Sequence, residues 1–366
     1  MEPLLEDIVC RGRCDIATLP IRAPLRCLSL LYRAGVRFRT FLYDRGALGT
    51  ERVPCTVVSI GAIALGGTGK TPVTIMTARL LLDAGYRIAV VSRGYRRASR
   101  GVLVVSDGSG RIRSPWETGD EPHLIASSLP GVPVVVGEHR AKAAALACDR
   151  FHPDIIVLDD GFQHRRLRRD ADVVTLDAAH PFGNGFLLPR GTLREPPEAL
   201  ARARAIVFTR CTEDLDHEQC ERAVRPYNSR APVFFSRHAP VRLRPLGNGE
   251  NIGLGSIPGK RVAALSNIAH PDSFHRMLAS LGADILRVHV MPDHHRYRNG
   301  ELERIERDAA DHGADMLVMT AKDERNLPEG YTPAAVRSYV LDMEAVLLSD
   351  HEHFLDFILG KPGLSE

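Results

Sequence analysis

The chain has 366 residues, of which 44% are apolar and 25% are charged, as in a globular protein of about two domains. Its net charge of +3 is too small to indicate nucleic-acid binding by itself. No apolar stretch approaches the ~20 residues of a transmembrane helix. We therefore expect no membrane-spanning segment. The seven cysteines form no Cys-x-x-Cys pair, so we expect free thiols.

The first segment with a clear pattern covers residues 20–43. Leu28, Leu31, Tyr32 and Val36 recur at helical spacing, and every charged side chain in the segment is an arginine. Such a pattern is typical of a helix that lies on an anionic lipid surface. A helix that covers a sheet, with arginines extending to solvent, has the same pattern. The residues alone leave both alternatives open.

A glycine-rich stretch, Gly66 to Thr71, follows an apolar, β-branched strand at residues 56–60 and precedes a helix predicted from residue 73 to 82. This order predicts a phosphate-binding loop. In such a loop the backbone N–H groups bind the phosphates, Lys70 reaches the β- and γ-phosphates, and the Thr71 hydroxyl binds Mg²⁺. Ala64 stands where the usual pattern has glycine. The stretch therefore predicts binding of a nucleoside triphosphate, with adenine as the default base.

Predicted strands and helices alternate from residue 56 onward. This alternation predicts an α/β fold, a P-loop NTPase-like parallel sheet with helices on both faces. We expect this core domain at 44–238, a short polar linker at 239–259, and a second, smaller α/β domain at 260–366 that closes over the active site. The strands are expected near 56–60, 88–91, 102–105, 132–136, 155–158, 173–176, 205–208, 233–236, 261–265, 285–290, 316–319 and, as an exposed strand, 340–348.

Acidic side chains near strand and helix ends are candidates for the rest of the site. Asp159 and Asp160 follow strand 155–158, at the sheet edge where ligands bind, and a phosphate loop needs an acid from a neighbouring strand to hold magnesium. Gln163 lies on the same edge and is able to complete the metal shell. Asp120 and Glu121 begin a helix, where an acid often only stabilises the N-terminus.

Basic side chains allow more than one role. Arg140 begins a predicted helix, where it either clamps phosphate or forms an exposed ion pair. His294 follows Asp293 after a strand of the second domain, an arrangement that tunes a base. The run 165–169 is basic but has no interleaved aromatic residues, so we expect no nucleic-acid partner.

Several longer strings extend this pattern. They include Asp-Asp-Gly-Phe-Gln-His-Arg-Arg-Leu at 159–167 and Phe-Gly-Asn-Gly-Phe-Leu-Leu-Pro-Arg-Gly-Thr-Leu-Arg-Glu-Pro at 182–196. With the strings at 66–72, 92–95, 119–122, 292–295 and 319–323, they resemble tetraacyldisaccharide 4'-kinase, the lipid A 4'-kinase of Gram-negative bacteria. The resemblance runs from about residue 20 to the C-terminus.

The resemblance implies a peripheral kinase at the cytoplasmic face of the inner membrane. It would use ATP and Mg²⁺ to phosphorylate the 4'-hydroxyl of an acylated glucosamine disaccharide 1-phosphate, with residues 1–43 on the anionic lipid. Asp120 is implied as the general base and His294 as its partner. The implied sites are, for catalysis, Asp120, His294, Lys70, Asp159 and Arg194; for the nucleotide, Gly66, Gly67, Thr68, Gly69, Lys70, Thr71 and Arg140; and for the metal, Thr71, Asp160, Gln163 and Glu121.

A second hypothesis stays open. A nucleotide-dependent switch or metallochaperone would use the same phosphate loop and the same acids, although it gives no role to Asp120, His294 or residues 20–43. The chain also departs from the family pattern at Ala62 and Asn267, where the family has asparagine and glycine.

Overall fold

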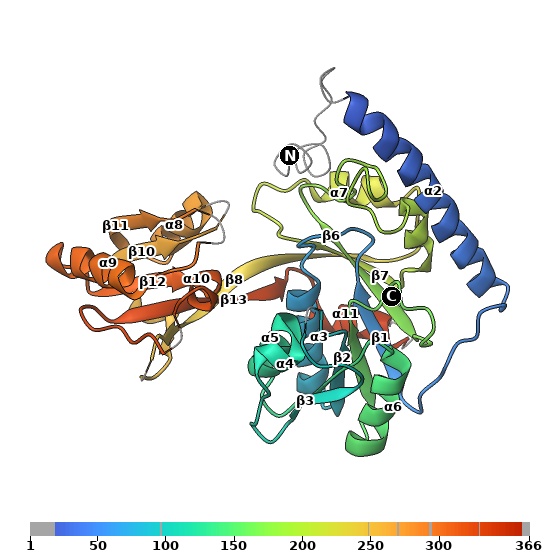
Figure 1. Cartoon of the computed structure of the whole chain (residues 1–366), viewed down its shortest axis with the longest axis horizontal. Helices are drawn as coiled ribbons and strands as arrows, with labels where there is room; N and C mark the ends of the chain where they lie inside the picture. The colour runs from blue at the N-terminus through green and yellow to red at the C-terminus, as the bar shows by residue number, and fades with distance from the viewer. Residues whose placement is uncertain are drawn as a thin grey trace. The chain divides into compact units, whose positions relative to one another are not determined.

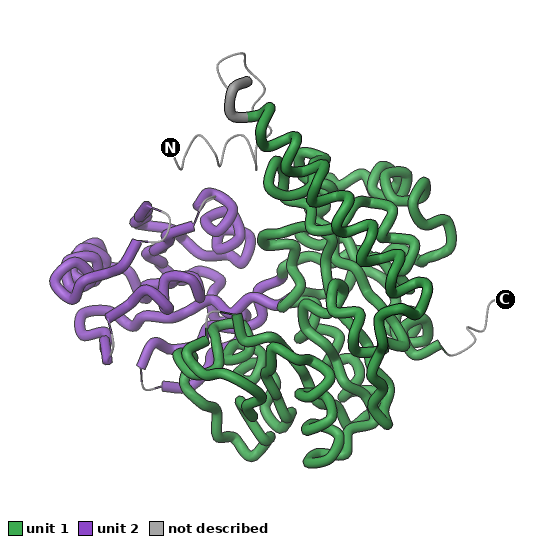
Figure 2. The backbone as a smooth tube through the Cα atoms, turned by 45° about the vertical axis from the view of Figure 1, so that its right-hand side comes forward, with its two compact units in different colours: residues 1–238, 345–366 green, residues 239–344 purple. Residues whose placement is uncertain are grey.

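The computed structural model describes residues 19–95, 97–247, 249–268, 271–292, 295–328 and 330–360. The chain forms two compact units (Figure 2): unit 1 contains residues 1–238 and 345–366, and unit 2 contains residues 239–344. Within the described ranges, no helix is long and apolar enough to cross a membrane. All cysteines in these ranges are free thiols, as predicted, while Cys10 and Cys14 lie outside them.

Unit 1 is built on a mostly parallel sheet with strand order β8-β7-β6-β1-β5-β2-β4-β3. Only the pairing of β3 with β4 is antiparallel among these neighbours. The prediction of a parallel α/β sheet is thus confirmed except at this edge. The strands are β1 (Thr56–Gly61), β2 (Ile88–Ser92), β3 (Leu103–Asp107), β4 (Pro133–Val136), β5 (Ile155–Asp159), β6 (Ala171–Asp177), β7 (Ala205–Thr209) and β8 (Val233–Pro245).

Helices cover both faces of this sheet (Figure 1). Along β5, Ile155 and Val157 pack in the core that contains α3, whereas Ile156 and Leu158 pack in the core that contains α6. Because both faces are buried, the strands are continuous apolar runs. One face carries α3 (Lys70–Asp83), α5 (Asp120–Ser128) and α11 (His351–Leu359), and the other carries α6 (Arg140–Phe151) and α7 (His217–Val224); α4 (Pro115–Thr118) and the 3₁₀ helix η2 (Pro197–Arg202) are shorter.

Helix α2 (Leu19–Asp44) lies on unit 1 and has two different faces (Figure 1). On the inner face, Ser29 Oγ donates to the Leu187 carbonyl at 2.8 Å. The outer face carries large apolar side chains that are 49–69% exposed: Leu28, Leu30, Leu31, Phe38 and Phe41. The predicted apolar stripe is therefore divided, because Leu28 and Leu31 point outward while Tyr32 turns toward unit 1. The helix thus covers unit 1, as one alternative predicted, and also presents an exposed apolar face, for which lipid binding stays a prediction.

Unit 2 has its own parallel sheet, in the order β11-β10-β12-β13. Helix α8 packs on one face through Phe274 and Leu278, and helix α9 packs on the other through Leu302 and Ile305. The elements are β9 (Ile252–Gly253), the 3₁₀ helix η3 (Leu254–Ser256), β10 (Arg261–Ser266), α8 (Pro271–Ser280), β11 (Asp284–Val290), α9 (Asn299–Asp311), β12 (Met316–Thr320), α10 (Ala321–Arg325) and β13 (Ser338–Leu347).

The boundaries of the units differ from the expected ones in two places. Residues 239–259 are not a separate linker, because β8 continues into unit 2 as a strand of 13 residues and β9 pairs with it. Two of the polar residues that suggested a linker, Arg242 and Arg244, form ion pairs with Asp342 of β13. Residues 345–360 belong to unit 1, where Phe354 packs edge-on against Phe234. Strand β13 is mostly buried rather than exposed.

Candidate active site

The glycine-rich loop lies between β1 and α3, as predicted. Gly66 and Gly69 have φ values of 96° and 73°, in the left-handed region that favours glycine. Thr209 Oγ1 donates to the Thr68 carbonyl at 3.1 Å, and Thr175 Oγ1 donates to Thr68 Oγ1 at 3.3 Å. Strands β6 and β7 therefore fix the loop, whose backbone N–H groups precede a helix N-terminus suited to phosphate.

The two departures around β1 are accommodated by the backbone. Ala64, at the position of the pattern glycine, forms an antiparallel bridge with Leu193. A side chain is tolerated there because an extended backbone does not require glycine. Ala62 is fully buried, and its carbonyl accepts a hydrogen bond from Gln163 Nε2 at 2.8 Å. The contact to Gln163 thus needs no side-chain amide at position 62.

Asp159, at the end of β5, is almost fully buried and accepts two hydrogen bonds. Thr74 Oγ1 donates at 3.1 Å and Ser92 Oγ donates at 2.9 Å. Burial, with the negative charges of Glu121 and Asp160, raises the pKa of Asp159 to about 6. Two hydroxyl groups therefore hold Asp159 at the end of β5, and its charge depends on pH near neutrality.

This buried carboxyl predicts a pH-dependent difference in stability. Its pKa is about 6 in the folded state against an ordinary value of 3.8, so the folded state binds the proton more tightly. The resulting stabilisation is full below pH ~4 and is lost as the pH rises through about 6. Since Asp159→Asn has no charge to bury, we expect it to gain up to about 3 kcal/mol in unfolding free energy over wild type at pH 7.5, and little at pH 4.

Urea denaturation at the two pH values measures this difference. Asp83→Asn, at the exposed end of α3, is the matched control and should differ from wild type equally at both pH values. If the difference in unfolding free energy between wild type and Asp159→Asn did not change with pH, the raised pKa of Asp159 would be contradicted.

Asp160, the next residue, faces two cations. Its carboxylate lies 3.8 Å from Lys70 Nζ, and both of its oxygens lie 2.9 Å from Arg194 Nη1. Burial acts to raise the pKa of Asp160, but Lys70 and Arg194 outweigh it and hold the pKa below its usual value. Asp160 is therefore ionised at neutral pH, as a ligand for a hard cation must be.

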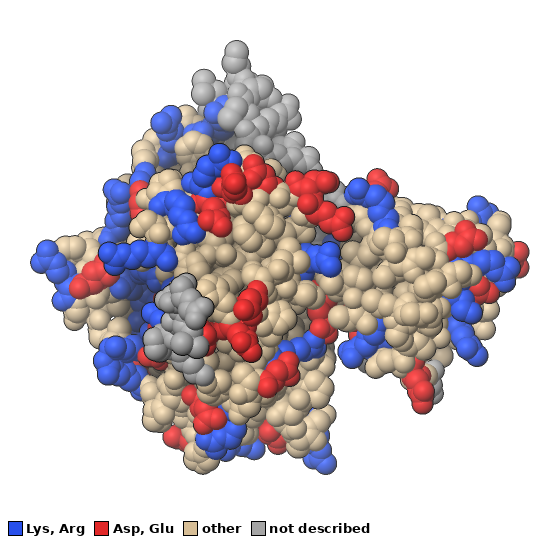
Figure 3. Space-filling view, turned by 180° about the vertical axis from the view of Figure 1, so that it is seen from behind, with Lys and Arg blue, Asp and Glu red and all other residues tan. Residues whose placement is uncertain are grey.

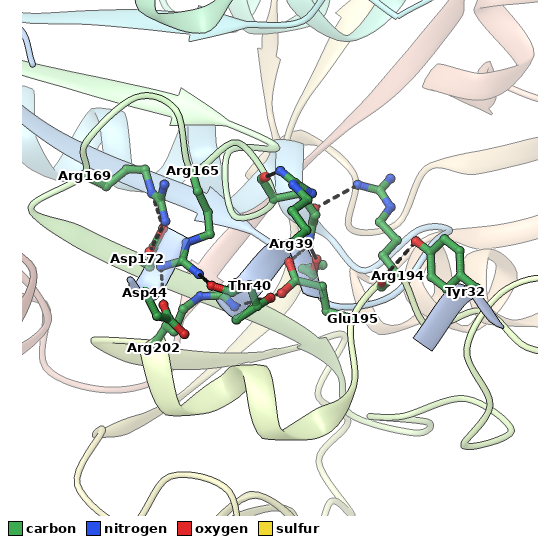
Figure 4. A network of polar contacts seen from close by, with 12 residues as sticks. Tyr32, Arg39, Thr40, Asp44, Arg165, Arg169, Asp172, Arg194, Glu195 and Arg202 are labelled. Carbon is green, nitrogen blue, oxygen red and sulfur yellow. Dashed lines mark hydrogen bonds and ion pairs between the residues drawn. The ribbon is translucent and has the colours of Figure 1, made fainter. Parts of the chain in front are cut away.

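Gln163, Arg194 and Glu195 form one hydrogen-bonded group beside Asp160. Figure 4 shows Arg194 and Glu195 of this group. Arg194 Nη1 donates to Gln163 Oε1 at 3.4 Å, and Gln163 Nε2 donates to Glu195 Oε1 at 3.1 Å. Glu195 is only 6% exposed and is also held by Arg202 at 2.9 Å. The sequence did not single out Glu195, because an acid between an arginine and a proline has no motif of its own.

Arg140 is buried at the start of α6. Its Nη1 donates to the carbonyls of Gly137 and Glu138 at 3.4 and 3.2 Å. Burial, followed by the charge of Arg93, lowers the pKa of Arg140 to about 10, so the side chain is cationic at neutral pH. The negative charges of Asp160 and Asp159 act to raise this pKa. The structure thus brings Arg140 into the electrostatic environment of Asp159 and Asp160.

Asp120 and Glu121 form the first turn of α5, and both are exposed. Gly119 precedes them with a φ of 91°, and a Cβ atom there would lie 2.9 Å from the Tyr95 carbonyl. This close approach fixes the start of α5 against the loop that follows β2. Glu121 contributes to the raised pKa of Asp159, so it belongs to the same electrostatic group. The Asp120 carboxylate is accessible at the surface beside it.

His294 lies outside the described residues, as does Asp293. The segment that follows is well anchored within unit 2. Tyr297 Oη donates to Asp323 Oδ1 at 2.6 Å, and Asn267 Nδ2 donates to the His295 carbonyl at 3.2 Å. Asn267, where the family has glycine, thus contributes one of these anchors.

The oxygen donors near the loop fit Mg²⁺. This cation takes one or two carboxylates together with phosphate oxygens and waters. Thr71 is buried at the start of α3, and the ionised Asp160 lies beside Lys70 of the same helix. Over the part of the chain that the structure describes, no three His, Cys, Asp or Glu side chains form a metal-binding group. With nucleotide bound, phosphate oxygens and waters would supply the further ligands that Mg²⁺ takes.

Comparison with known proteins gives a consistent result. The family model of LpxK, tetraacyldisaccharide-1-P 4'-kinase, matches residues 21–361. The tetraacyldisaccharide 4'-kinase of Syntrophus aciditrophicus (strain SB) is 46% identical over 319 residues, covering 84% of this chain and 85% of the relative. That of Anaeromyxobacter sp. (strain K) is 45% identical over 329 residues, covering 89% and 87%.

A solved structure extends the match to three dimensions. The crystal structure of the "apo" form of LpxK from Aquifex aeolicus in complex with ATP is 31% identical, with a TM-score of 0.71. It covers 93% of this chain and 99% of the solved one. Because the family model and the relatives both span most of its length, the chain belongs to the tetraacyldisaccharide-1-P 4'-kinase family.

Proposed function

We propose that the chain binds ATP on the loop Gly66–Thr71 and transfers the γ-phosphoryl group to the 4'-hydroxyl of a tetraacylated glucosamine disaccharide 1-phosphate, forming lipid IVA for lipid A biosynthesis. The observation that carries this proposal is the cluster of Lys70, Arg194 and Asp160 at the mouth of a phosphate loop. Phosphoryl transfer needs little covalent chemistry from the protein, and such a cluster supplies the positioning and charge that it does need.

Each residue of the site has a definite role in this reaction. Asp120 accepts the proton of the 4'-hydroxyl as its oxygen attacks the γ-phosphorus, and His294 supports the basicity of Asp120. Lys70 and Arg194 stabilise charge on the phosphoryl oxygens. Bound Mg²⁺ would neutralise β- and γ-phosphate charge, and Thr71, Asp160, Gln163 and Glu121 are the candidates to hold it.

Nucleotide binding must rearrange one feature of the site. Lys70 and Arg194 both pair with Asp160 in this structure. A phosphate group would compete with the carboxylate for these cations, which releases Asp160 oxygens for a metal. His294 belongs by sequence to unit 2, so its role in proton transfer requires closure of the units during the catalytic cycle.

We further propose that the enzyme acts as a peripheral protein at the cytoplasmic face of the inner membrane. The outer face of α2 exposes Leu31 to 69% and Phe38 to 64%, and exposed apolar patches mark sites of interaction with a membrane or a protein. Figure 3 shows basic side chains grouped on the side of unit 1 where α2 lies. Apolar side chains flanked by cations suit an anionic bilayer that holds the acyl chains of the substrate.

Negative charges introduced on this outer face are expected to weaken vesicle binding. The double variant Leu31→Glu/Phe38→Glu should bind phosphatidylglycerol-containing vesicles at least about tenfold more weakly, because each buried apolar side chain contributes about 1.5–3 kcal/mol. Co-sedimentation with vesicles measures the effect. Leu348→Glu changes another exposed leucine, 44% exposed and outside α2, and should bind like wild type. Equal binding by the double variant and wild type would rule out a membrane role for this face.

The direct test of the activity is mass spectrometry of the lipid product. With ATP, MgCl₂ and the tetraacylated disaccharide 1-phosphate, the product should be heavier by one phosphate. An unchanged lipid mass with active, folded protein would contradict the proposal.

A further inference from the structure

The inner face of α2 contacts two residues of the active site through their main chains. Tyr32 Oη donates to the Arg194 carbonyl at 3.0 Å (Figure 4). The Arg39 guanidinium donates to the Gln163 carbonyl. The side chains of Arg194 and Gln163 hydrogen-bond to each other, and Arg194 also holds Asp160. Helix α2 therefore hydrogen-bonds to the main chains of Arg194 and Gln163, whose side chains lie beside Asp160.

These contacts form a tight interface rather than a substrate pocket. The cavity between α2 and the site has a volume of about 40 Å³, which is room for water and not for a sugar or an acyl chain. Its lining residues come from both sides: Tyr32, Val36, Arg39, Thr40, Gln163, Arg165, Arg194 and Glu195. Burial raises the pKa of the Tyr32 hydroxyl, which therefore remains a hydrogen-bond donor at neutral pH.

Further contacts hold the same end of α2. The guanidinium groups of Arg39 and Arg165 lie 5.7 and 5.1 Å from the centre of the Tyr43 ring. Arg165 also forms an ion pair with Asp44 at 2.7 Å. Since a helix is stiff over a few turns, a displacement of α2 would reach Gln163 and Arg194 rather than be absorbed within the helix.

We propose that Tyr32 and Arg39 are positioning residues that couple the seating of α2 on a lipid surface to phosphoryl transfer. The proposal rests on the kinase function above and adds that the lipid surface acts on kcat, not only on substrate capture. The outer face of α2 meets the bilayer, while the inner face fixes Arg194 and Gln163 around Asp160. A misplacement of about 1 Å at such groups costs on the order of 100-fold in rate.

A soluble acceptor separates this effect from substrate capture. The deacylated disaccharide 1-phosphate is phosphorylated with and without phosphatidylglycerol-containing vesicles that carry no acceptor. For wild type we expect the vesicles to raise kcat several-fold. Arg39→Ala and Tyr32→Phe should lower kcat with vesicles about tenfold or more and abolish the stimulation, while the KM for ATP changes less than about twofold. Arg39→Lys keeps a donor for the Gln163 carbonyl and should recover most of the stimulation.

Arg37→Ala is the matched control, because it removes the same charge from α2 but loses only a contact with Glu198 at 3.8 Å. Any fall in kcat for Arg39→Ala beyond that for Arg37→Ala reports the lost carbonyl contact. Tyr32→Phe removes one hydroxyl, and an unchanged thermal midpoint would confirm that it is folded.

The coupling is overturned if vesicles do not stimulate wild type on the soluble acceptor, or if Arg39→Ala and Arg37→Ala respond equally. Failure of the kinase function itself is distinguishable, because wild type would then form no phosphorylated product with the acylated substrate in vesicles either.

Discussion

Replacement of Asp120 by asparagine is expected to lower kcat by about 10²–10⁴, the usual contribution of a general base. The change keeps the size of the side chain at the start of α5 and removes its ability to accept a proton. Asp120 is exposed and has no part in the phosphate loop, so the KM for ATP should change little. Steady-state kinetics with the acylated disaccharide, over a range of ATP concentrations, separate the two parameters.

Glu117→Gln provides the comparison for this experiment. Glu117 lies on α4, just before α5, and its carboxylate is 3.9 Å from Arg113. Loss of this nearby acid should leave kcat within about twofold of wild type, since a surface ion pair contributes little. If Asp120→Asn behaved like Glu117→Gln, another group would have to accept the proton.

Lys70→Met is expected to lower kcat/KM by about 10²–10³, because it removes a preorganised cation from the phosphoryl oxygens. The methionine keeps much of the lysine volume at the start of α3, where Lys70 is only 11% exposed in its side chain. The thermal midpoint should therefore change little without ligand, while its increase on adding ATP should become smaller.

Lys142→Met, on the exposed side of α6, is the control for loss of a lysine from a helix of unit 1. It should retain both the activity and the ATP-dependent rise in thermal midpoint. Wild-type kcat/KM in the Lys70→Met variant would show that the loop does not hold the transferred phosphate.

The phosphate loop could be predicted from the sequence because its function depends on local order. A buried strand, Gly66 to Thr71 and a helix are adjacent in the chain, and the structure places them as β1, loop and α3. The same holds for Asp159 and Asp160, which end β5 beside β1. The family match confirms the kinase hypothesis. The alternative, a nucleotide-dependent switch, rested only on the phosphate loop and on Asp159 and Asp160.

Other parts of the site depend on contacts between distant residues and could not be predicted. Thr74 and Ser92 come from α3 and β2, and only the fold brings both hydroxyls to Asp159. Glu195 becomes a site residue only because it is buried against Gln163. Similarly, the C-terminal helix α11 belongs to unit 1 because Phe354 packs against Phe234, a contact that no local pattern reveals.

Helix α2 shows the limit of periodicity. Apolar residues at helical spacing predicted one stripe, but a helix has two faces that periodicity alone does not distinguish. The polar side chains Ser29, Tyr32 and Arg39 determine which face turns toward unit 1, because they find carbonyl acceptors at Leu187, Arg194 and Gln163: a pairing visible only in the fold.

The inferred reaction is transfer of the γ-phosphoryl group of ATP to the 4'-oxygen of the disaccharide at the site around Asp160. Its most direct test is phosphorus–proton correlation NMR of the product, together with the amount of ATP consumed. We expect one new phosphate coupled to the proton at the 4' carbon, and one ATP consumed for each product molecule. ATP hydrolysis that is unchanged by the lipid, with no phosphate at that carbon, would contradict it.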